Sequence, residues 1–139
     1  MHDAINVGNL ECPITDATTQ KGFKSAHFKV PKASLKLLED FQVLSLANNH
    51  IADYLEQGFQ DTIRSLKEKS FQYFGLGKND QEALSPIIIE SAEHRIAFFG
   101  ASRWANIDKD HPTGTAPENI SNLKRLIKDL KKQGCIVIP

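Results

Sequence analysis

Two asparagines and a histidine, Asn48-Asn49-His50, follow the apolar run Val43–Leu46 after one alanine, and a carboxylate, Asp53, comes three residues later. A turn needs only one asparagine, so three polar side chains at one strand end indicate a position that faces a ligand. A second polar cluster, Asn9-Leu10-Glu11, follows the short apolar run Ala4–Val7. The two clusters supply amide, carboxylate and imidazole groups, which are the side chains to examine first for chemistry.

Glu11, Asn49 and His50 are oxygen and nitrogen donors of the types that bind a divalent metal such as manganese, zinc or iron. A metal would lower the pKa of a bound water and neutralise charge on a phosphoryl or carboxyl oxygen, and His50 could donate a proton to a leaving group. The simpler interpretation also stands: the asparagines as turn residues, His50 as a hydrogen-bonded core histidine and Glu11 as a solvated carboxylate.

Strands that alternate with amphipathic helices must position these groups. Solid apolar strands favour an α/β fold whose sheet is covered on both faces, and ligands of such sheets gather at the carboxyl ends of the strands. Strands 86–89 and 95–99 are predicted to form a hairpin. The predicted strands are Ala4–Val7, Val43–Leu46, Phe71–Phe74, Pro86–Ile89, Arg95–Phe99 and Cys135–Pro139, and the predicted helices start at Pro31, at Leu55 and at Asn119 or Ser121.

Length and charge exclude several classes of protein. The 139 residues suit a single domain, and 17 basic residues balance 17 acidic ones. This balance gives no electrostatic footprint for nucleic acid and argues against adhesion to anionic membranes. No apolar run reaches the roughly 20 residues of a transmembrane helix, and the N-terminus lacks the order of a signal peptide. As written, the chain is expected to be cytoplasmic, with Cys12 and Cys135 as free, buried thiols.

The motifs together resemble the CapA family of poly-γ-glutamate capsule synthesis proteins. The resemblance runs through NLECPIT (9–15), LANNHIADYLEQGFQDT (46–62), GLG (75–77) and Glu82-Ala83, and so covers nearly the whole chain. That family is similar to the calcineurin-like metallophosphatases. The resemblance therefore implies an α/β, metallophosphatase-like layered sheet with helices on its outer faces.

The resemblance also implies roles for individual residues. Asn49 would be a metal ligand and His50 a proton donor, while Glu11 would bind metal where a metallophosphatase has a bridging aspartate. Asp53 is placed with His50 in the catalytic set, where it would orient the imidazole or cap the turn. The remaining amides, Asn9 and Asn48, are expected to bind substrate.

Two family features are missing from the sequence. The family's first strand, which ends in Gly-Asp, would precede Asn9, and its His-Trp-Gly-x-Glu segment would follow Pro139. Residues 1–139 are therefore expected to be a single partial domain, incomplete at both ends and inactive alone. His27, His94 and His111 are not favoured as additional metal ligands, because they lie in loops and turns.

Three functions follow from this reading. In a complete domain the chain would belong to a metal-dependent, phosphoesterase-like hydrolase that acts on an anionic substrate. Alternatively, it is a non-catalytic capsule-assembly component that binds poly-γ-glutamate or another subunit, with Lys21, Lys24 and Lys29 as candidate contacts for the polyanion. The third alternative is that the sequence is a truncated reading frame whose product has no function of its own. Trp104 is expected to pack, and the location stays open because family members are commonly tethered to membranes.

Overall fold

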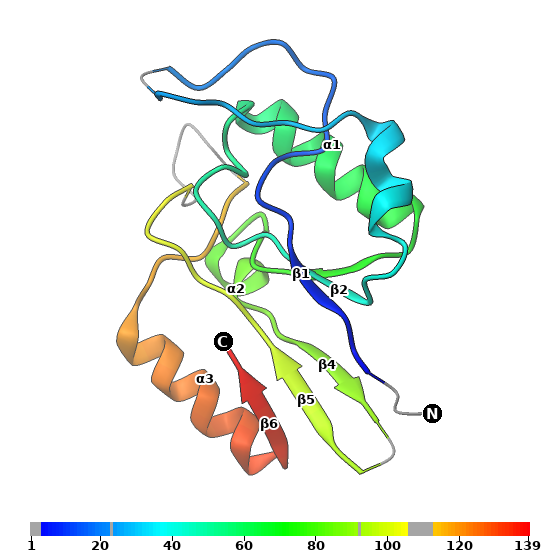
Figure 1. Cartoon of the computed structure of the whole chain (residues 1–139). Coiled ribbons are helices and arrows are strands. Elements are labelled where there is room, and N and C mark those ends of the chain that lie inside the picture. Colours follow the sequence, from blue (N-terminus) through cyan, green and yellow to red (C-terminus); the bar gives the residue numbers. More distant parts are fainter. Residues whose placement is uncertain (1–3, 23, 92, 106–112) are drawn as a thin grey trace.

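Two three-stranded sheets organise the chain (Figure 1). The computed structural model describes residues 4–22, 24–91, 93–105 and 113–139. The first sheet is parallel and has the order β1-β2-β3. In the second sheet, ordered β4-β5-β6, β4 is antiparallel to β5 and β5 is parallel to β6. The strands are β1 (Val7–Asn9), β2 (Val43–Ser45), β3 (Gln72–Phe74), β4 (Ile87–Glu90), β5 (Arg95–Phe98) and β6 (Cys135–Ile138).

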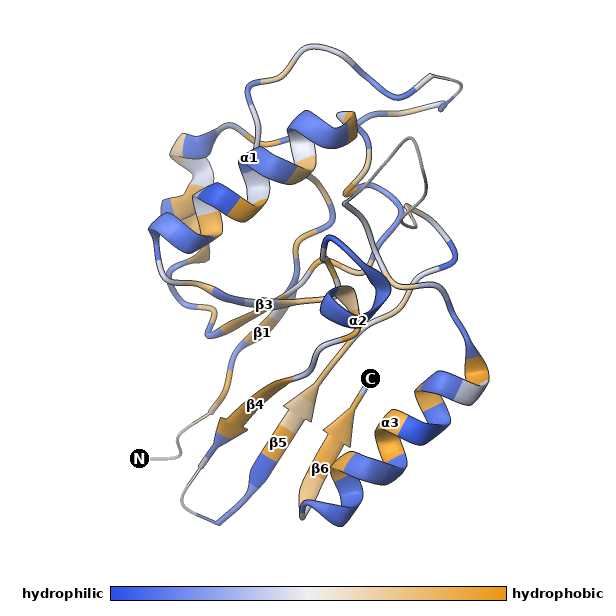
Figure 2. Ribbon diagram, turned by 180° about the vertical axis from the view of Figure 1, so that it is seen from behind, coloured by the Kyte–Doolittle hydropathy of each residue, from blue (hydrophilic) through white to orange (hydrophobic). Residues whose placement is uncertain are grey.

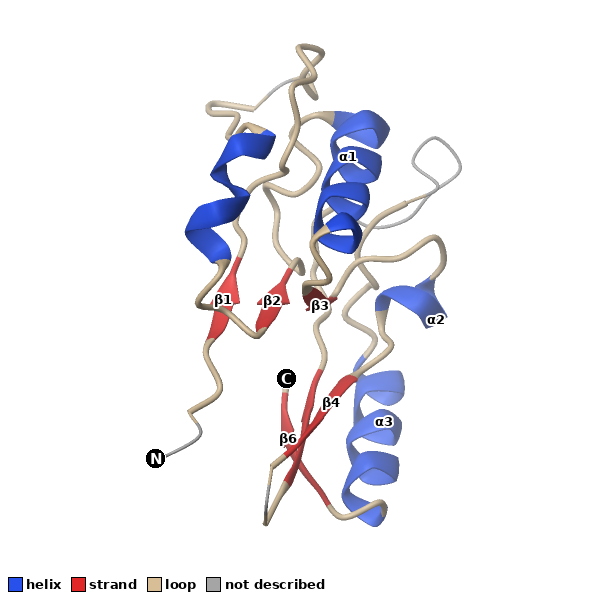
Figure 3. Ribbon diagram, turned by 90° about the vertical axis from the view of Figure 1, so that its right-hand side faces the viewer, coloured by secondary structure: helices blue, strands red, loops and turns tan. Residues whose placement is uncertain are grey.

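Helices form the parallel crossovers within each sheet (Figure 3). The α-helix α1 (Leu55–Glu68) connects β2 to β3, and α3 (Ile120–Lys132) connects β5 to β6. A 3₁₀ helix, η1 (Lys32–Leu38), precedes β2, and the short helix α2 (Asp80–Ala83) follows β3. The Asn119 side chain accepts a hydrogen bond from the Asn122 N–H and so starts α3.

The strands alternate side chains between a helix and the opposite sheet. In β2, Leu44 packs in the cluster formed by η1 and α1, whereas Val43 packs with Phe74 and Phe98 between the sheets. In β5, Phe98 faces the first sheet and Ala97 packs under α3. This alternation follows from the two-residue period of a strand. It buries both faces of β2 and of the end of β5, which explains why those strands read as solid apolar runs, whereas Ile136 and Ile138 of β6 stay exposed.

Most predicted elements are confirmed. The strands at 43–46, 71–74, 86–89, 95–99 and 135–139 and the helices at 55–69 and 119–132 occur within one or two residues of their predicted bounds. The segments at 86–89 and 95–99 form the predicted antiparallel hairpin. The α/β fold with a parallel sheet flanked by helices is therefore present.

Three predictions differ from the structure. The first strand is Val7–Asn9 and not Ala4–Val7, because its partner β2 begins at Val43, which pairs with Val7. The segment after Pro31 forms a 3₁₀ helix. Trp104 was expected to pack, but it is 66% exposed. The sequence analysis also missed α2, although Asn79 and Glu82 carry the spacing of a capping box, and the Asn79 side chain accepts from the Glu82 N–H at 2.8 Å.

Neither cysteine forms a disulfide: Cys12 is half-buried and Cys135 is buried, as predicted. Among the described residues, the helices are too short or too polar to cross a bilayer.

A buried hydroxyl attaches α1 to the segment after β1. Thr62 Oγ1 accepts a hydrogen bond from the Ile14 N–H at 2.9 Å and donates to the Gly58 carbonyl at 2.7 Å. One residue earlier, the Asp61 carboxylate accepts from Thr15 Oγ1 at 2.6 Å. These bonds connect the Pro-Ile-Thr and Gly-x-x-Asp-Thr motifs directly, so the motifs fix how the segment that leads away from β1 crosses the helix.

Replacement of Thr62 by Val should lower the free energy of unfolding by about 1–3 kcal/mol, because it leaves the buried Ile14 N–H without its acceptor. Chemical denaturation of the two proteins measures the difference. Ser65→Ala is the matched control: Ser65 is also buried in α1, but its hydroxyl has no hydrogen-bond partner among the described residues. Ser65→Ala should leave stability unchanged or raise it, and an equal loss in both variants would contradict the anchoring role of Thr62.

Candidate functional site

The two polar clusters lie at the same edge of the first sheet. β1 and β2 are parallel neighbours, and Asn9 at the end of β1 pairs with Ser45 at the end of β2. The Leu10 N–H donates to the Ser45 carbonyl at 3.0 Å and extends the pairing past the last strand residue. The two polar clusters therefore lie at the ends of neighbouring strands.

Asn48 joins the end of β1 to the Asn-Asn-His turn. Its side-chain nitrogen donates to the Leu10 carbonyl at 2.9 Å and to Asn9 Oδ1 at 3.2 Å. Its side-chain oxygen accepts from the N–H groups of His50 and Ile51 at 3.1 and 2.9 Å. The buried amide thus uses both its donor and its acceptor group on protein atoms, which is the behaviour of a turn-forming asparagine. Its predicted contact with substrate stays a prediction.

Glu11 connects to this turn through a single intervening side chain. Asn9 Nδ2 donates to Glu11 Oε2, while Asn9 Oδ1 accepts from Asn48. The structure records no direct bond from Glu11 to Asn49 or His50 among the described residues. Asn49 takes part through its main chain, because its carbonyl accepts from Lys24 Nζ at 2.9 Å.

A buried carboxylate holds His50. Asp53 has no exposed side-chain surface, and its Oδ2 lies 2.8 Å from His50 Nδ1. The same oxygen accepts the Phe28 N–H at 2.8 Å, and Oδ1 accepts from Lys24 Nζ. Both oxygens are therefore occupied by protein donors, which fits a positioning carboxylate better than a metal ligand.

The surroundings of Asp53 keep it ionised. Burial alone would raise the pKa of this carboxyl, but the hydrogen bonds from Lys24, the Phe28 N–H and His50, with the charge of Lys24, outweigh burial and hold the pKa below the ordinary value of 3.8. An anionic Asp53 favours a proton on His50 Nδ1 and leaves Nε2 as the nitrogen that can face a substrate. The catalytic roles of Asp53 and His50 stay predictions.

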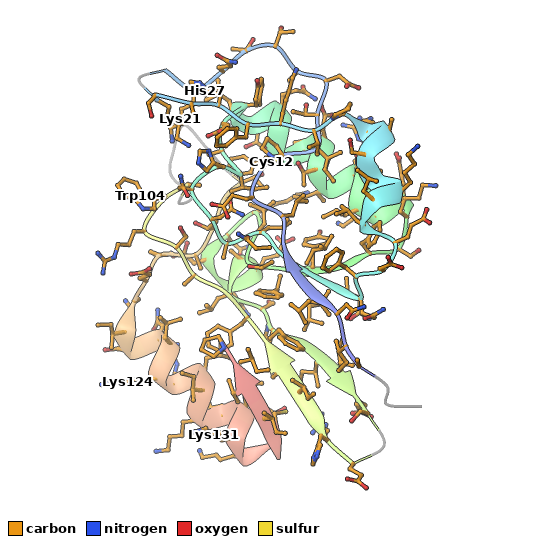
Figure 4. The ribbon with its side chains drawn as sticks, viewed as in Figure 1. Cys12, Lys21, His27, Trp104, Lys124 and Lys131 are labelled. Atoms are coloured by element: carbon orange, nitrogen blue, oxygen red, sulfur yellow. The ribbon has the colours of Figure 1, made fainter. Side chains whose placement is uncertain are left out.

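The strap, residues 16–22 and 24–29, crosses the turn; its lysines were predicted only as contacts for a polyanion, not as partners of Asp53. Lys24 and Phe28 contact Asp53 as described, and the Lys21 N–H donates to the Asp53 carbonyl at 2.9 Å. The Phe28 ring lies against the His50 ring, with centroids 4.5 Å apart. His27 lies on the same strap, and its ring nitrogen bonds the Lys21 carbonyl (Figure 4). The strap thus encloses the His50–Asp53 pair from one side.

Two of the three strap lysines, Lys24 and Lys29, bind protein atoms through their side chains. Besides the contacts of Lys24, Lys29 Nζ donates to the Ala17 carbonyl at 2.6 Å and lies 4.9 Å from the centre of the Tyr54 ring. The suggestion that Lys24 and Lys29 meet a polyanion therefore finds no support in their contacts. The sequence signal that could have identified Lys24 is the need of a buried aspartate for a cation.

Cys12 lies in the segment that follows β1 (Figure 4), close enough to Asp53 and Glu11 for their charges to act on its thiol. Burial raises the pKa of its thiol, and the negative charges of Asp53 and Glu11 raise it further. Both effects favour the neutral form of the thiol at neutral pH.

The donors present do not make a self-contained metal centre. Within the described part of the chain, no three His, Cys, Asp or Glu side chains come together to hold an ion. Glu11, the Asn49 amide and His50 Nε2 are the groups left after the internal bonds are assigned. His94 is exposed beside the β4–β5 hairpin turn, and His111 lies outside the described residues.

A parallel sheet flanked by helices, with polar side chains gathered at its carboxyl edge, defines an α/β protein of the kind whose ligands bind at the strand ends. The chain belongs to the family described as "Bacterial capsule synthesis protein PGA_cap", which it matches over residues 2–138. The family is associated with poly-γ-glutamate capsule biosynthesis, and the resemblance found in the sequence is confirmed.

Individual relatives agree with this assignment. The chain is 33% identical over 98 residues to "Capsule biosynthesis protein CapA" of Bacillus anthracis, covering 67% of this chain and 24% of that protein. It is 30% identical over 141 residues to "PGA biosynthesis protein CapA" of Bacillus subtilis (strain 168), covering 94% of this chain and 36% of that protein. The chain thus spans about a quarter to a third of the length of these relatives.

Replacement of Lys24 by Gln should raise the pKa of Asp53, because burial then acts against fewer compensating donors. The contribution of a carboxyl with a depressed pKa is present above pH 3.8 and is lost as the pH falls through its folded pKa. The free energy of unfolding of the variant should therefore be about 1–3 kcal/mol lower than that of the parent at pH 7. This difference between the two proteins should become smaller below pH 3.8.

Urea unfolding of both proteins between pH 7 and pH 3 measures this difference in unfolding free energy. Lys29→Gln is the matched control, because it removes an equal charge from the strap without touching Asp53. Parallel profiles of the Lys24 and Lys29 variants would show that Lys24 does not set the ionisation of Asp53.

Proposed function

We propose that this chain is the part of a CapA-type protein that supplies the proton-donating histidine of a site for poly-γ-glutamate synthesis. The carrying observation is the 2.8 Å contact of His50 Nδ1 with the buried Asp53 carboxylate. Membership of the capsule synthesis family supports the proposed role in poly-γ-glutamate synthesis. In the complete protein the reaction class would be hydrolysis of a phosphoester or of a bond in an anionic polymer intermediate.

The proposed chemistry centres on the second nitrogen of His50. Asp53 fixes the ring through Nδ1, so Nε2 is the atom that would give a proton to the leaving oxygen. Phe28 against the ring and the Asn48 bond to the His50 N–H restrict its movement. Lys24 helps to hold Asp53 anionic, and the anion in turn fixes the orientation of the imidazole through Nδ1.

Glu11 and Asn49 are proposed as donors to a divalent metal such as manganese, zinc or iron. Glu11 is joined to the turn through Asn9, and Asn49 is adjacent to His50 in the chain. A metal at this position would need further ligands, because the described residues do not complete a site. Asn9 and Asn48 are proposed to line the substrate side of the same edge.

A second role, as a non-catalytic capsule-assembly component, is favoured by a different observation. The helix α3, which packs on the second sheet and not on the sheet that carries the Asn-Asn-His turn, presents a row of lysines to solvent. Such a surface could hold an anionic polymer, or an acidic capsule-synthesis subunit, without any chemistry at His50.

His50→Gln in a full-length protein that carries this segment should lower the kcat of metal-stimulated phosphoester hydrolysis by about 10²–10⁴-fold. The physical reason is the loss of the proton donor with its contact to Asp53. His94→Gln, which changes an exposed histidine outside the site, is the control and should retain activity.

Polymer production by cells that carry the same variants separates the two roles. Loss of both hydrolysis and polymer in His50→Gln supports catalysis. Unchanged hydrolysis in His50→Gln would refute the catalytic proposal, and full polymer production without any hydrolysis would favour the assembly role.

A further inference from the structure

Positive charge is concentrated on α3. The helix sequence ISNLKRLIKDLKK contains five basic side chains and a single acidic one, Asp129. The whole chain carries equal numbers of acidic and basic residues, 17 of each. The neutral total therefore conceals a local excess of positive charge that a calculation of net charge does not reveal.

Packing fixes which face of α3 meets solvent. Four apolar side chains of the helix pack on the second sheet, against Ala97, Phe99 and Cys135: they are Leu123, Leu126, Ile127 and Leu130. Figure 2 shows this division, with apolar residues of α3 toward β6 and polar residues on the outer side. The basic side chains are consequently held on one outward face of a helix that is immobilised by its core contacts.

Three of the lysines form a row, the α3 lysine row, which consists of Lys124, Lys128 and Lys131. They follow the spacing i, i+4, i+7 and are all exposed, and Lys124 and Lys131 extend outward at the two ends of the row (Figure 4). The α-helical rise separates them by about 6 and 4.5 Å along the axis. The row therefore lies along the helix as a line of charges roughly 10 Å long.

The row has no internal partner among the described residues. The Asp129 carboxylate lies 3.5 Å from Lys132 Nζ, and Arg125 bonds the Asn122 side chain, so the nearby polar groups serve other residues. Like charges four residues apart destabilise a helix. Lys131 is favourable near the helix C-terminus, but that effect does not extend to Lys124 or Lys128. An external anion would relieve the repulsion.

We propose that the α3 lysine row is a docking surface for the polycarboxylate chain of poly-γ-glutamate. This inference rests on the proposed role in poly-γ-glutamate synthesis and adds a second site to it. A flexible polymer with regularly repeated carboxylates can pair with several ammonium groups of a linear row at once, so weak single contacts act together. The strap offers no comparable row, because Lys24 and Lys29 are bound internally and only the side chain of Lys21 is left.

A hydrophilic polymer fits the row better than a lipid surface does. Helices that lie on membranes insert an apolar face below the headgroups. The apolar face of α3 is already buried against the second sheet and cannot do so. Binding through the row would thus be purely electrostatic and strongly weakened by salt.

Fluorescence anisotropy with labelled poly-γ-glutamate and the full chain tests the proposal. The triple variant Lys124→Gln, Lys128→Gln, Lys131→Gln should bind roughly tenfold more weakly than the parent at low salt, since exposed charge pairs are individually weak but act together here. The control triple variant, Lys32→Gln, Lys36→Gln, Lys69→Gln, loses the same charge on a different face and should keep the parent affinity. Thermal unfolding verifies that both variants fold.

Each other outcome overturns the inference. If both triple variants lost the same affinity for poly-γ-glutamate, only the net charge of the protein would matter. If the α3 variant kept the parent affinity, the α3 lysine row would not be the binding surface. Vesicles of phosphatidylglycerol and phosphatidylcholine provide the remaining comparison: binding to vesicles but not to polymer would make the row a membrane contact. None of these results depends on His50, so a failure here leaves the test of hydrolysis untouched.

Discussion

The buried Asp53 carboxylate is the group on which the arrangement around the Asn-Asn-His turn depends. An ionised carboxylate without exposed surface needs donors for both oxygens, and Asp53 obtains them from His50, Lys24 and the Phe28 N–H. Two of these donors come from the strap and one from the turn. One charge therefore determines where a segment distant in sequence crosses the site and how the imidazole is oriented.

The rest of the fold supplies the position of this charge. The parallel pairing of β1 and β2 brings Asn9 level with Ser45, and Asn48 then ties the turn back to Leu10. Behind them, Thr62 of α1 holds Ile14 in the segment that continues from β1. The sheet edge is thus fixed from the strand side and from the helix side. The family motifs at 9–15 and 46–62 are the two halves of this contact network.

Local patterns in the sequence predicted most helices and strands and the polar clusters at two strand ends. They could do so because apolar periodicity and capping residues act over short distances. The contacts of the strap with Asp53 could not be predicted, since Lys24 and Phe28 have no periodicity and acquire these contacts from a residue 25 to 29 positions away. Asn48 shows the same limit: its residue type fits a ligand site and a turn equally well, and only its four hydrogen bonds distinguish them. Trp104 was misjudged because apolar character alone does not specify burial.

The most direct measurement is the pKa of the Asp53 side chain, followed by the carbon-13 chemical shift of its carboxyl during an acid titration. If the carboxylate is stabilised by Lys24, Phe28 and His50 as the contacts indicate, its midpoint lies below 3.8. A midpoint above that value would mean that burial dominates, that the aspartate takes up its proton more readily than a free one, and that it does not act as the anionic anchor of His50.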